Sequence, residues 1–324
     1  MKNTEKPFIL ERPSDVMRQY IDAVAVFEAY EEAKKEAAQF RGGMYWHKGP
    51  PSAPDVTYLV RTSSSGSETG LGARSPETIA MYETFHANKN LAEQRLGGLK
   101  NALDVHRRMN RALRVGRVAP IIVEILNQLE TTKLSAHFRV VGTHALYAYE
   151  ATAGVFFNDA AVATKDIDLL WDVRNHLAFA TALTRLDSSM LGVLKKVDPT
   201  FRIRNAQKYT AVNKDGFEVD IIRRQKQEKD PHPIKLSAAD DDFWVAQAPR
   251  AHLLQDSPSF SAVIVASDGT MARMNTLNPV SFIQFKEWLS TLPERDALKR
   301  RRDSLQAKAV EYVVKEYLPH LATK

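Results

Sequence analysis

The chain has 324 residues, of which 44% are hydrophobic and 26% are charged, an ordinary balance for a soluble globular protein with a sizeable core. It contains no cysteine, which excludes disulfides and thiolate chemistry. Neither a secretory h-region nor an apolar run of membrane-spanning length occurs, so we expect a cytoplasmic protein with no membrane partner. The formal charge of +6 is compatible with an anionic partner such as nucleic acid or nucleotide, although excess charge also serves solubility.

The N-terminal part of the chain is predicted to be mainly helical. Residues 14–41 follow a helical pattern that Ser14 can cap and that Gly42 and Gly43 stop. Residues 47–74 are rich in Gly, Ser and Pro, which predicts a loop interrupted by one short strand-like piece, VTYLV.

A second long helix is predicted after this loop. Ser75 can cap it, and Pro76 is favoured at its first position. We expect it to reach about residue 114, with a break near the Gly97-Gly98 pair. Its last turns carry a row of arginines that could follow a nucleic-acid backbone or simply be solvated, namely Arg107, Arg111 and Arg114.

The middle of the chain alternates between predicted helices and strands. Residues 119–130 predict a helix that leads into a short strand, HFRVVG. A helix, the strand DIDLLWD, a helix and a hairpin with its turn at Lys214–Gly216 follow. This unit has the size of a small α/β domain. We therefore expect three regions: a mainly helical region 1–118, a core 119–235, and a C-terminal hairpin and helical domain 236–324.

Two carboxylates share one face of the predicted strand in TKDIDLLWD. Successive strand residues point to opposite faces, so Asp166 and Asp168 point to one side and the intervening Ile167 to the other. Two such carboxylates lie roughly 7 Å apart. At an effective dielectric constant of about 20 they repel by roughly 2 kcal/mol. The pattern indicates either a polar face on an edge strand or a site for a positive group.

Two further features favour the second interpretation. FEVDII places Asp220 on a hairpin strand, on the face opposite its hydrophobic neighbours. Gly142 and Thr143 lie at a strand-to-helix turn, where the free amides of a helix N-terminus suit a phosphate. Three carboxylates beside such a turn are what two-metal phosphoryl transfer requires, because Mg²⁺ takes oxygen ligands and paired metals stabilise the attacking and leaving oxygens. The metals would also replace carboxylate repulsion with attraction.

This combination resembles the signature of the DNA polymerase β-like nucleotidyltransferase superfamily, Gly-Ser or Gly-Thr followed by D-h-D and a later h-D-h, with h hydrophobic. It is more distantly similar to the AbiEii and MenT type nucleotidyltransferases, some of which are toxins of toxin-antitoxin pairs. More specifically, the chain resembles a bacterial family with the segments RGGMYW (41–46), GAR (72–74), VVGTHAL (140–146), TKDIDLL (164–170), EVDII (218–222), and FIQFKEWL, ERD and KRRRDSLQA within 282–307.

The resemblance implies an α+β fold, with a small mixed β-sheet nucleotidyltransferase core flanked by an N-terminal helical region and a C-terminal helical domain. It implies that Asp166 and Asp168 bind two Mg²⁺ ions, and that Asp220 completes the metal site and helps to activate the acceptor hydroxyl. Gly142 and Thr143 would hold the triphosphate of the NTP. The gap from Gly142 to Asp166 is longer than in many superfamily members.

The expected reaction moves NMP from an NTP, for instance ATP, onto an acceptor hydroxyl and releases pyrophosphate without a covalent enzyme intermediate. The basic charge favours an RNA or tRNA 3′ end as the acceptor, over a protein side chain or a small molecule.

Cations for the triphosphate are expected in the C-terminal helical region. Lys286 interrupts an apolar stretch, and Arg295 and Lys299 follow it, so all three are candidates for nucleotide binding. A run such as KRRRD is also typical of a solvated helix face. Asp303 is expected to orient Arg302 through an ion pair.

Four other features leave alternatives open. Glu218 shares the face of Asp220 and could be a ligand or solvated. Arg74 could close over the nucleotide or belong to a disordered loop. His144 could touch the nucleotide, although packing at the helix start is favoured. The nine histidines are scattered, which argues against a zinc site.

Three other functions compete with nucleotidyl transfer. A restriction-type nuclease would want a lysine two residues after the last carboxylate, where this chain has Ile222. A non-catalytic module that binds RNA or a partner is disfavoured because all three aspartates are present. A toxin role would be the same chemistry in another biological setting. Nothing in the sequence indicates the oligomeric state.

Overall fold

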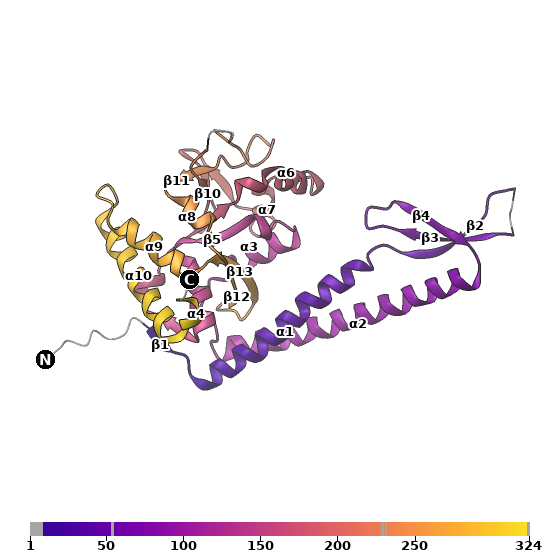
Figure 1. Cartoon of the computed structure of the whole chain (residues 1–324), viewed down its shortest axis with the longest axis horizontal. Coiled ribbons are helices and arrows are strands. Elements are labelled where there is room, and N and C mark those ends of the chain that lie inside the picture. Colours follow the sequence, from indigo (N-terminus) through magenta and orange to yellow (C-terminus); the bar gives the residue numbers. More distant parts are fainter. Residues whose placement is uncertain (1–8, 53–54, 228–229, 231, 323–324) are drawn as a thin grey trace. The chain divides into compact units, whose positions relative to one another are not determined.

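A computed structural model describes residues 9–52, 55–227, 230 and 232–322, and it divides into two compact units (Figure 1). The larger unit consists of Met1–Met17 with Leu113–Lys324, and the smaller one of Arg18–Ala112. Mixed sheets with flanking helices confirm the predicted α+β fold. The region boundaries near residues 118 and 235 stay a prediction. Within the described residues, no helix is both long and apolar enough to span a membrane.

The smaller unit pairs two long helices with a three-stranded antiparallel sheet (Figure 1). Arg95 on the second helix forms an ion pair with Glu36 on the first at 2.7 Å. Near the other end, Gln19 donates to Asn110 at 2.9 Å, so the helices are antiparallel neighbours. The elements are α1 (Ser14–Gln39, which begins in the larger unit), β2 (Met44–Lys48), β3 (Thr57–Thr62), β4 (Glu68–Ala73) and α2 (Pro76–Ala112).

Two predictions for this unit are wrong. The predicted loop over 47–74 contains β4 and the end of β2. The sequence did not indicate β4, because all six of its residues are exposed and show no apolar alternation. Only the pairing with β3 identifies it as a strand. Residues 53–54 of that loop lie outside the described residues. The predicted break at Gly97-Gly98 is absent: α2 runs through both glycines, which cost about 1 kcal/mol each while the contacts with α1 hold the helix. The cap is confirmed, since the amide of Thr78 donates to the Ser75 hydroxyl.

The larger unit is built on an eight-stranded mixed sheet. Its strands are β5 (Phe138–Val141), β7 (Asp166–Trp171), β8 (Arg202–Arg204), β9 (Gln207–Val212), β10 (Glu218–Arg224), β11 (Ala246–Ala248), β12 (Ser259–Val265) and β13 (Met271–Leu277), and a separate pair is β1 (Ile9–Glu11) with β6 (Val155–Phe157). Its α-helices are α3 (Pro120–Thr131), α4 (Leu146–Ala153), α5 (Asp159–Val162), α6 (His176–Arg185), α7 (Met190–Lys195), α8 (Ala251–Gln255), α9 (Pro279–Ser290) and α10 (Ala297–Tyr317), and its 3₁₀ turns are η1 (Ser135–His137), η2 (Gly142–Ala145), η3 (Val173–Asn175) and η4 (Pro319–Leu321).

The strand order of the main sheet is β12-β13-β5-β7-β10-β9-β8, with β11 paired to the end of β10. β7 and β10 are parallel neighbours, and their register places Asp168 beside Asp220 and Asp166 beside Glu218. The predicted hairpin β12–β13 joins this sheet next to β5. The segment between β5 and β7 forms α4, β6 and α5, which accounts for the long gap between Gly142 and Asp166.

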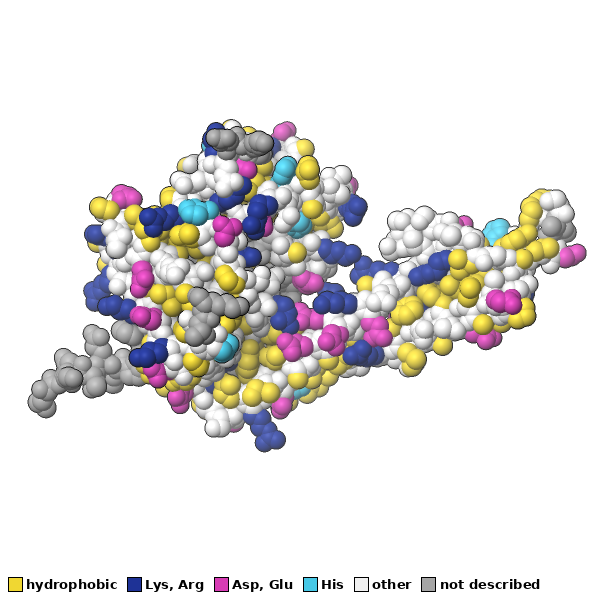
Figure 2. Space-filling view, in the orientation of Figure 1, with side chains coloured by type: hydrophobic (Ala, Val, Ile, Leu, Met, Phe, Trp, Pro, Cys, Tyr) yellow, Lys and Arg dark blue, Asp and Glu magenta, His cyan; other side chains and the backbone are white. Residues whose placement is uncertain are grey.

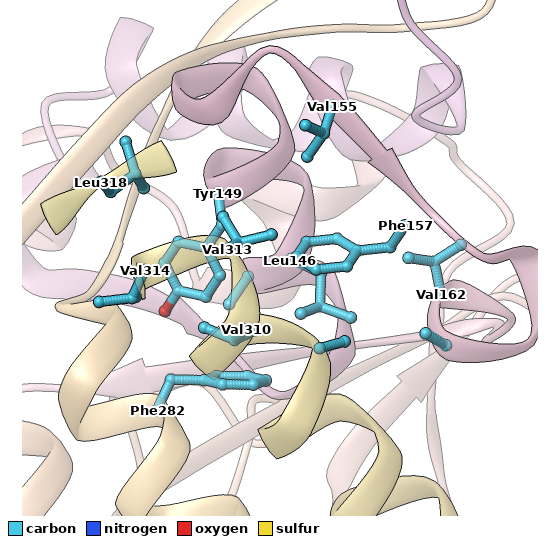
Figure 3. Packing of buried hydrophobic residues seen from close by; sticks show 13 residues of the cluster. Leu146, Tyr149, Val155, Phe157, Val162, Phe282, Val310, Val313, Val314 and Leu318 are labelled. Carbon is cyan, nitrogen blue, oxygen red and sulfur yellow. The ribbon is translucent and has the colours of Figure 1, made fainter. Parts of the chain in front are cut away.

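A hydrophobic cluster fixes α9 and α10 against α4 (Figure 3). Figure 3 shows Tyr149 of α4 and Phe282 of α9 meeting Val310 and Val313 of α10. All four side chains are buried, and each contributes about 1.5–3 kcal/mol to the hydrophobic stabilisation. Phe282 lies one turn before Lys286 on α9, so this packing also positions the Lys286 side chain.

Candidate active site

Three aspartates converge at the start of the β7–β10 pair. One carboxylate oxygen each from Asp166, Asp168 and Asp220 lies within 4.8 Å of the others, and all three residues are partly buried. The intervening Ile167 is fully buried, so the predicted alternation is confirmed. β7 lies inside the sheet between β5 and β10, which rules out the alternative of an edge strand with a solvated face.

Gly142 leaves the space in which the Asp168 carboxylate lies. β5 pairs with β7 so that Val141 is opposite Asp168, and Gly142 follows with a φ of 70°. A Cβ atom on Gly142 would lie 2.3 Å from Oδ2 of Asp168. Both the left-handed backbone and the close approach therefore require glycine here.

Replacing Gly142 by alanine is expected to lower the free energy of unfolding by about 2–4 kcal/mol, because it adds a clash to the backbone strain. Gly216→Ala is the matched control: Gly216 has a φ of 76° but nothing within 4 Å of its Cβ position, so that variant bears the backbone cost alone. Urea unfolding of both variants measures the difference. Equal destabilisation would mean that the Asp168 carboxylate moves aside freely.

Two threonines form hydrogen bonds with the carboxylates of Asp166 and Asp220. The hydroxyl of Thr164 donates to Oδ1 of Asp166, and that of Thr210 on β9 donates to Oδ1 of Asp220 at 2.5 Å. Sequence reasoning assigned no role to either threonine. Thr164 belongs to the T-x-D-I-D-L-L segment, so the motif could have pointed to it. Thr210 contacts Asp220 only through the register of β9 with β10, which the sequence does not show.

Burial and the neighbouring carboxylates raise the pKa of Asp168. Burial is the largest cause, the neighbouring Asp166 and Asp220 add to it, and together they raise this pKa to about 7, while Lys286 and Arg295 oppose the rise. Burial also raises the pKa of Asp220, against the hydrogen bond from Thr210. The site therefore favours a bound proton or cation over three free negative charges.

This shift predicts that the metal-free protein loses stability as the pH rises. The folded state holds a proton on Asp168 up to about pH 7, whereas the unfolded chain releases it near the ordinary value of 3.8. The stabilisation is complete below that value and is lost by about pH 7, which lowers the free energy of unfolding by at most about 4 kcal/mol.

Urea unfolding in EDTA at about pH 5 and about pH 8 measures this loss, and the same pair of measurements on Asp168→Asn isolates the contribution of that carboxyl group. Saturating Mg²⁺ is expected to reduce the loss, because the metal takes the place of the proton. An identical pH profile for the wild type and Asp168→Asn would contradict the prediction.

A buried ion pair from α9 and α10 adjoins the carboxylates. Nζ of Lys286 donates to Oδ1 of Asp303 at 2.8 Å, and Nε of Arg295 donates to Oδ2 at 2.5 Å. Asp303 is fully buried and Lys286 is 4% exposed. Burial lowers the pKa of Lys286, and the charges of Asp303 and Asp168 oppose that change. Asp303 therefore positions Lys286 and Arg295, rather than Arg302 as expected.

The other two nucleotide-site candidates differ in their surroundings. Thr143 is buried, and its hydroxyl accepts a hydrogen bond from Nε2 of Gln306 on α10 at 3.1 Å. The same Nε2 donates to the carbonyl of Ala161 at 2.7 Å, so Gln306 connects the turn after β5 to α5. Lys299 is exposed in the first turn of α10, where its amide donates to Asp296. Sequence reasoning missed Gln306, although it stands in the KRRRDSLQA segment.

The structure shows the surroundings of the residues whose roles were left open. Glu218 forms an ion pair with Arg204. His144 is buried against the rings of Tyr147 and Phe217, and burial lowers its pKa to about 4, which supports its packing role. Among the described residues, the group that could hold a metal consists of Asp166, Asp168 and Asp220.

The arginines singled out before the core lie in or next to the smaller unit. Arg74 stacks over the ring of Trp46, with 5.2 Å from Cζ to the ring centroid. Arg107, Arg111 and Arg114 are exposed. The residues near Arg74 therefore form an aromatic-basic contact within the smaller unit.

Comparison with known families decides the identity of the larger unit. A family model described as nucleotidyltransferase matches residues 121–324, more than half of the chain. The chain belongs to this nucleotidyltransferase family. It is thus a transferase that uses a nucleotide substrate, and its acidic cluster could hold the divalent metal of such enzymes. No match was found among curated proteins or among solved structures.

Proposed function

We propose that this nucleotidyltransferase binds an NTP together with two Mg²⁺ ions, transfers the NMP to an acceptor hydroxyl and releases pyrophosphate. The observation that carries the proposal is the convergence of Asp166, Asp168 and Asp220, with one oxygen of each within 4.8 Å of the others. An all-oxygen donor set suits Mg²⁺, whereas zinc sites favour His and Cys.

In this proposal Asp166 and Asp168 hold the metals, and Asp220 completes the site. The metals would polarise the α-phosphate and neutralise charge on the attacking and leaving oxygens. Asp220 accepts the proton as the acceptor oxygen forms its bond to the α-phosphorus, and the bond from that phosphorus to pyrophosphate breaks in line. The hydrogen bond from Thr210 keeps Asp220 in place for this role.

The triphosphate is assigned to the turn after β5 and to the cations of α9, of the loop that follows it, and of α10. Amides of Gly142 and Thr143 lie at the start of η2, next to Asp168. Lys286 and Arg295 are held together by the carboxylate of Asp303, and their positive charges act on Asp168, so we assign both to the metal-bound triphosphate. Lys299, exposed on the first turn of α10, is proposed as an outer contact.

The favoured acceptor is an RNA or tRNA 3′ end, with a protein hydroxyl as the alternative. The net charge of +6 supports an anionic acceptor. The nuclease alternative stays disfavoured, because Ile222 packs in a hydrophobic cluster with Val141 and Leu170 where a nuclease would place a lysine. A non-catalytic binding module, or a toxin that uses the same chemistry, remains the second candidate.

The test is transfer by the purified protein from each of the four α-³²P-labelled NTPs in turn, with Mg²⁺ and a crude lysate as the source of acceptors. Asp166→Ala is the control. Label in an RNA or protein band with the wild type alone would establish nucleotidyl transfer and name both the nucleotide and the acceptor class. A folded protein that binds Mg²⁺ but transfers no label from any NTP would support the binding-module alternative.

A further inference from the structure

Net charge alone does not locate the surface that receives the acceptor. On the face shown in Figure 2, Lys and Arg side chains are scattered among Asp and Glu rather than gathered in one patch. The order of the strands indicates the direction of approach of the acceptor, because β5 lies on one side of the aspartate-bearing strands β7 and β10, and β9 and β8 lie on the other.

The groups assigned to the triphosphate lie on the β5 side of the aspartates. The turn of Gly142 directly follows β5 and adjoins Asp168, and α9, which carries Lys286, follows β13, the strand next to β5. On the other side, β10 is followed by β9 and β8, and Arg204 of β8 forms an ion pair with Glu218 of β10. In-line displacement requires the acceptor oxygen to approach the phosphorus opposite the leaving pyrophosphate. The acceptor should therefore approach over β9 and β8.

Basic side chains line this second side of the sheet. Thr210 is in register with Asp220 and bonds to it, so it shares the face of the aspartates. Lys208 lies two residues earlier on β9, on the same face, is exposed, and is roughly 7 Å along the strand from Thr210. On β8, Arg202 is in register with Val212, which is itself in register with Glu218 beside Asp220. Arg202 is exposed and on this face as well.

An exposed tryptophan stands beside this row. The amide of Trp244 donates to the carbonyl of Lys208 at 3.1 Å, and its side chain is 40% exposed. Trp244 lies two residues before β11, whose first residue, Ala246, is in register with Ile222 of β10, two residues after Asp220. Lys235 pairs with Trp244 in a β-bridge, and its Nζ lies 5.9 Å from the centroid of the ring.

We propose that the acceptor is a single-stranded nucleic-acid end that lies along β9 and β8, with a base stacked on Trp244 and its phosphates on Lys208, Lys235 and Arg202. An exposed aromatic ring interleaved with cations is the arrangement by which proteins hold unpaired strands, since every base offers a ring face and every linkage a negative charge. The inference rests on the proposed function and assigns its acceptor.

The test is a fluorescence anisotropy titration of the full chain with a 5′-fluorescein single-stranded RNA of about twelve nucleotides that carries a free 3′ hydroxyl. Trp244→Ala is expected to weaken binding about tenfold or more, and Trp244→Phe to stay near the wild type, because it keeps a ring. Tyr312→Ala is the matched control: Tyr312 on α10 is also 40% exposed, and its removal should leave the affinity unchanged.

Salt dependence tests the cations separately. Lys208→Gln and Lys235→Gln should each reduce the slope of log K against log salt by about 0.7, the value for one phosphate contact to a single strand. Lys315→Gln, an exposed lysine on α10, should leave the slope unchanged. Equal RNA affinity of the wild type and Trp244→Ala, or label transferred only to a protein band, would overturn the assignment.

Calorimetry of Mg²⁺-NTP binding separates this inference from the proposed function. Trp244→Ala should bind the NTP as the wild type does, because its ring lies on the acceptor side. If the wild type binds NTP and Trp244→Ala binds RNA as tightly as the wild type does, the proposed acceptor surface is wrong and the proposed function still stands. Absence of Mg²⁺-dependent NTP binding in the wild type would overturn the proposed function itself.

Discussion

Replacing Asp168 by asparagine is expected to abolish nucleotidyl transfer, with a loss of at least about 1000-fold in kcat, while the fold is preserved. Asp168 is in register with Asp220, shares a face of β7 with Asp166, and adjoins Gly142. Its carboxylate is one of the two proposed to hold the metals. Without metal and above about pH 7, where the Asp168 carboxyl of the wild type is ionised, the variant should be more stable than the wild type, because one of three repelling charges is gone. Rates of label transfer, and thermal unfolding in EDTA, measure the two effects.

Asp172→Asn is the matched control for this variant. Asp172 lies just after the end of β7, and its carboxylate forms an ion pair with Arg174 at 2.8 Å, outside the three-aspartate cluster. Removing its charge should leave transfer and Mg²⁺ binding near the wild-type level. Turnover by Asp168→Asn at the rate of the wild type would refute the assignment of the metal site.

Removing one partner of the buried Lys286–Asp303 ion pair is expected to lower the free energy of unfolding by about 3–5 kcal/mol. Asp303→Leu leaves the ammonium of Lys286 buried without its partner, and Arg295 loses the same carboxylate. The double variant Lys286→Met with Asp303→Leu should recover most of this loss, because no uncompensated lysine charge then stays buried. Urea unfolding of the two single variants and the double variant measures the coupling.

Activity of the double variant then tests the cations around Asp303 apart from stability. If Lys286 and Arg295 attract the triphosphate, the double variant, which lacks the Lys286 charge and the partner of Arg295, should show a raised KM for NTP. Asp215→Asn is the control for stability, because the Lys214–Asp215 pair is exposed and its loss should change stability little. A double variant as unstable as Asp303→Leu would mean that packing around α9, rather than the unpaired charge, sets the cost.

Much of the candidate site follows from local pattern. Strand alternation places Asp166 and Asp168 on one face, because backbone geometry forces successive side chains to opposite sides. The same rule places Asp220 opposite two hydrophobic neighbours. Each inference needs only residues within one strand, and the structure brings all three carboxylates together. The family match over residues 121–324 agrees with the resemblance to nucleotidyltransferases drawn from the segments within that range.

Interactions between distant segments were beyond such reasoning. Asp303 takes Lys286 and Arg295 as partners because α9 and α10 pack together, whereas sequence adjacency pointed to Arg302. Gln306 reaches Thr143 across 163 residues of chain. β4 exists because β3 supplies its hydrogen bonds, not because ETGLGA favours an extended strand.

The sequence by itself determined the succession of α3, β5, α4, β7, α6 and the β9–β10 hairpin, the faces of the strands that carry the aspartates, and the glycine at the turn after β5, whereas it did not indicate β6, α5 or α7. These depend on backbone geometry and on residues close together in the chain. Only the tertiary structure decided that β7 is an inner strand with Asp168 beside Asp220, and that Lys286 is buried against Asp303. Strand order and helix packing depend on the burial of surfaces from distant segments, and no single stretch of sequence contains that information.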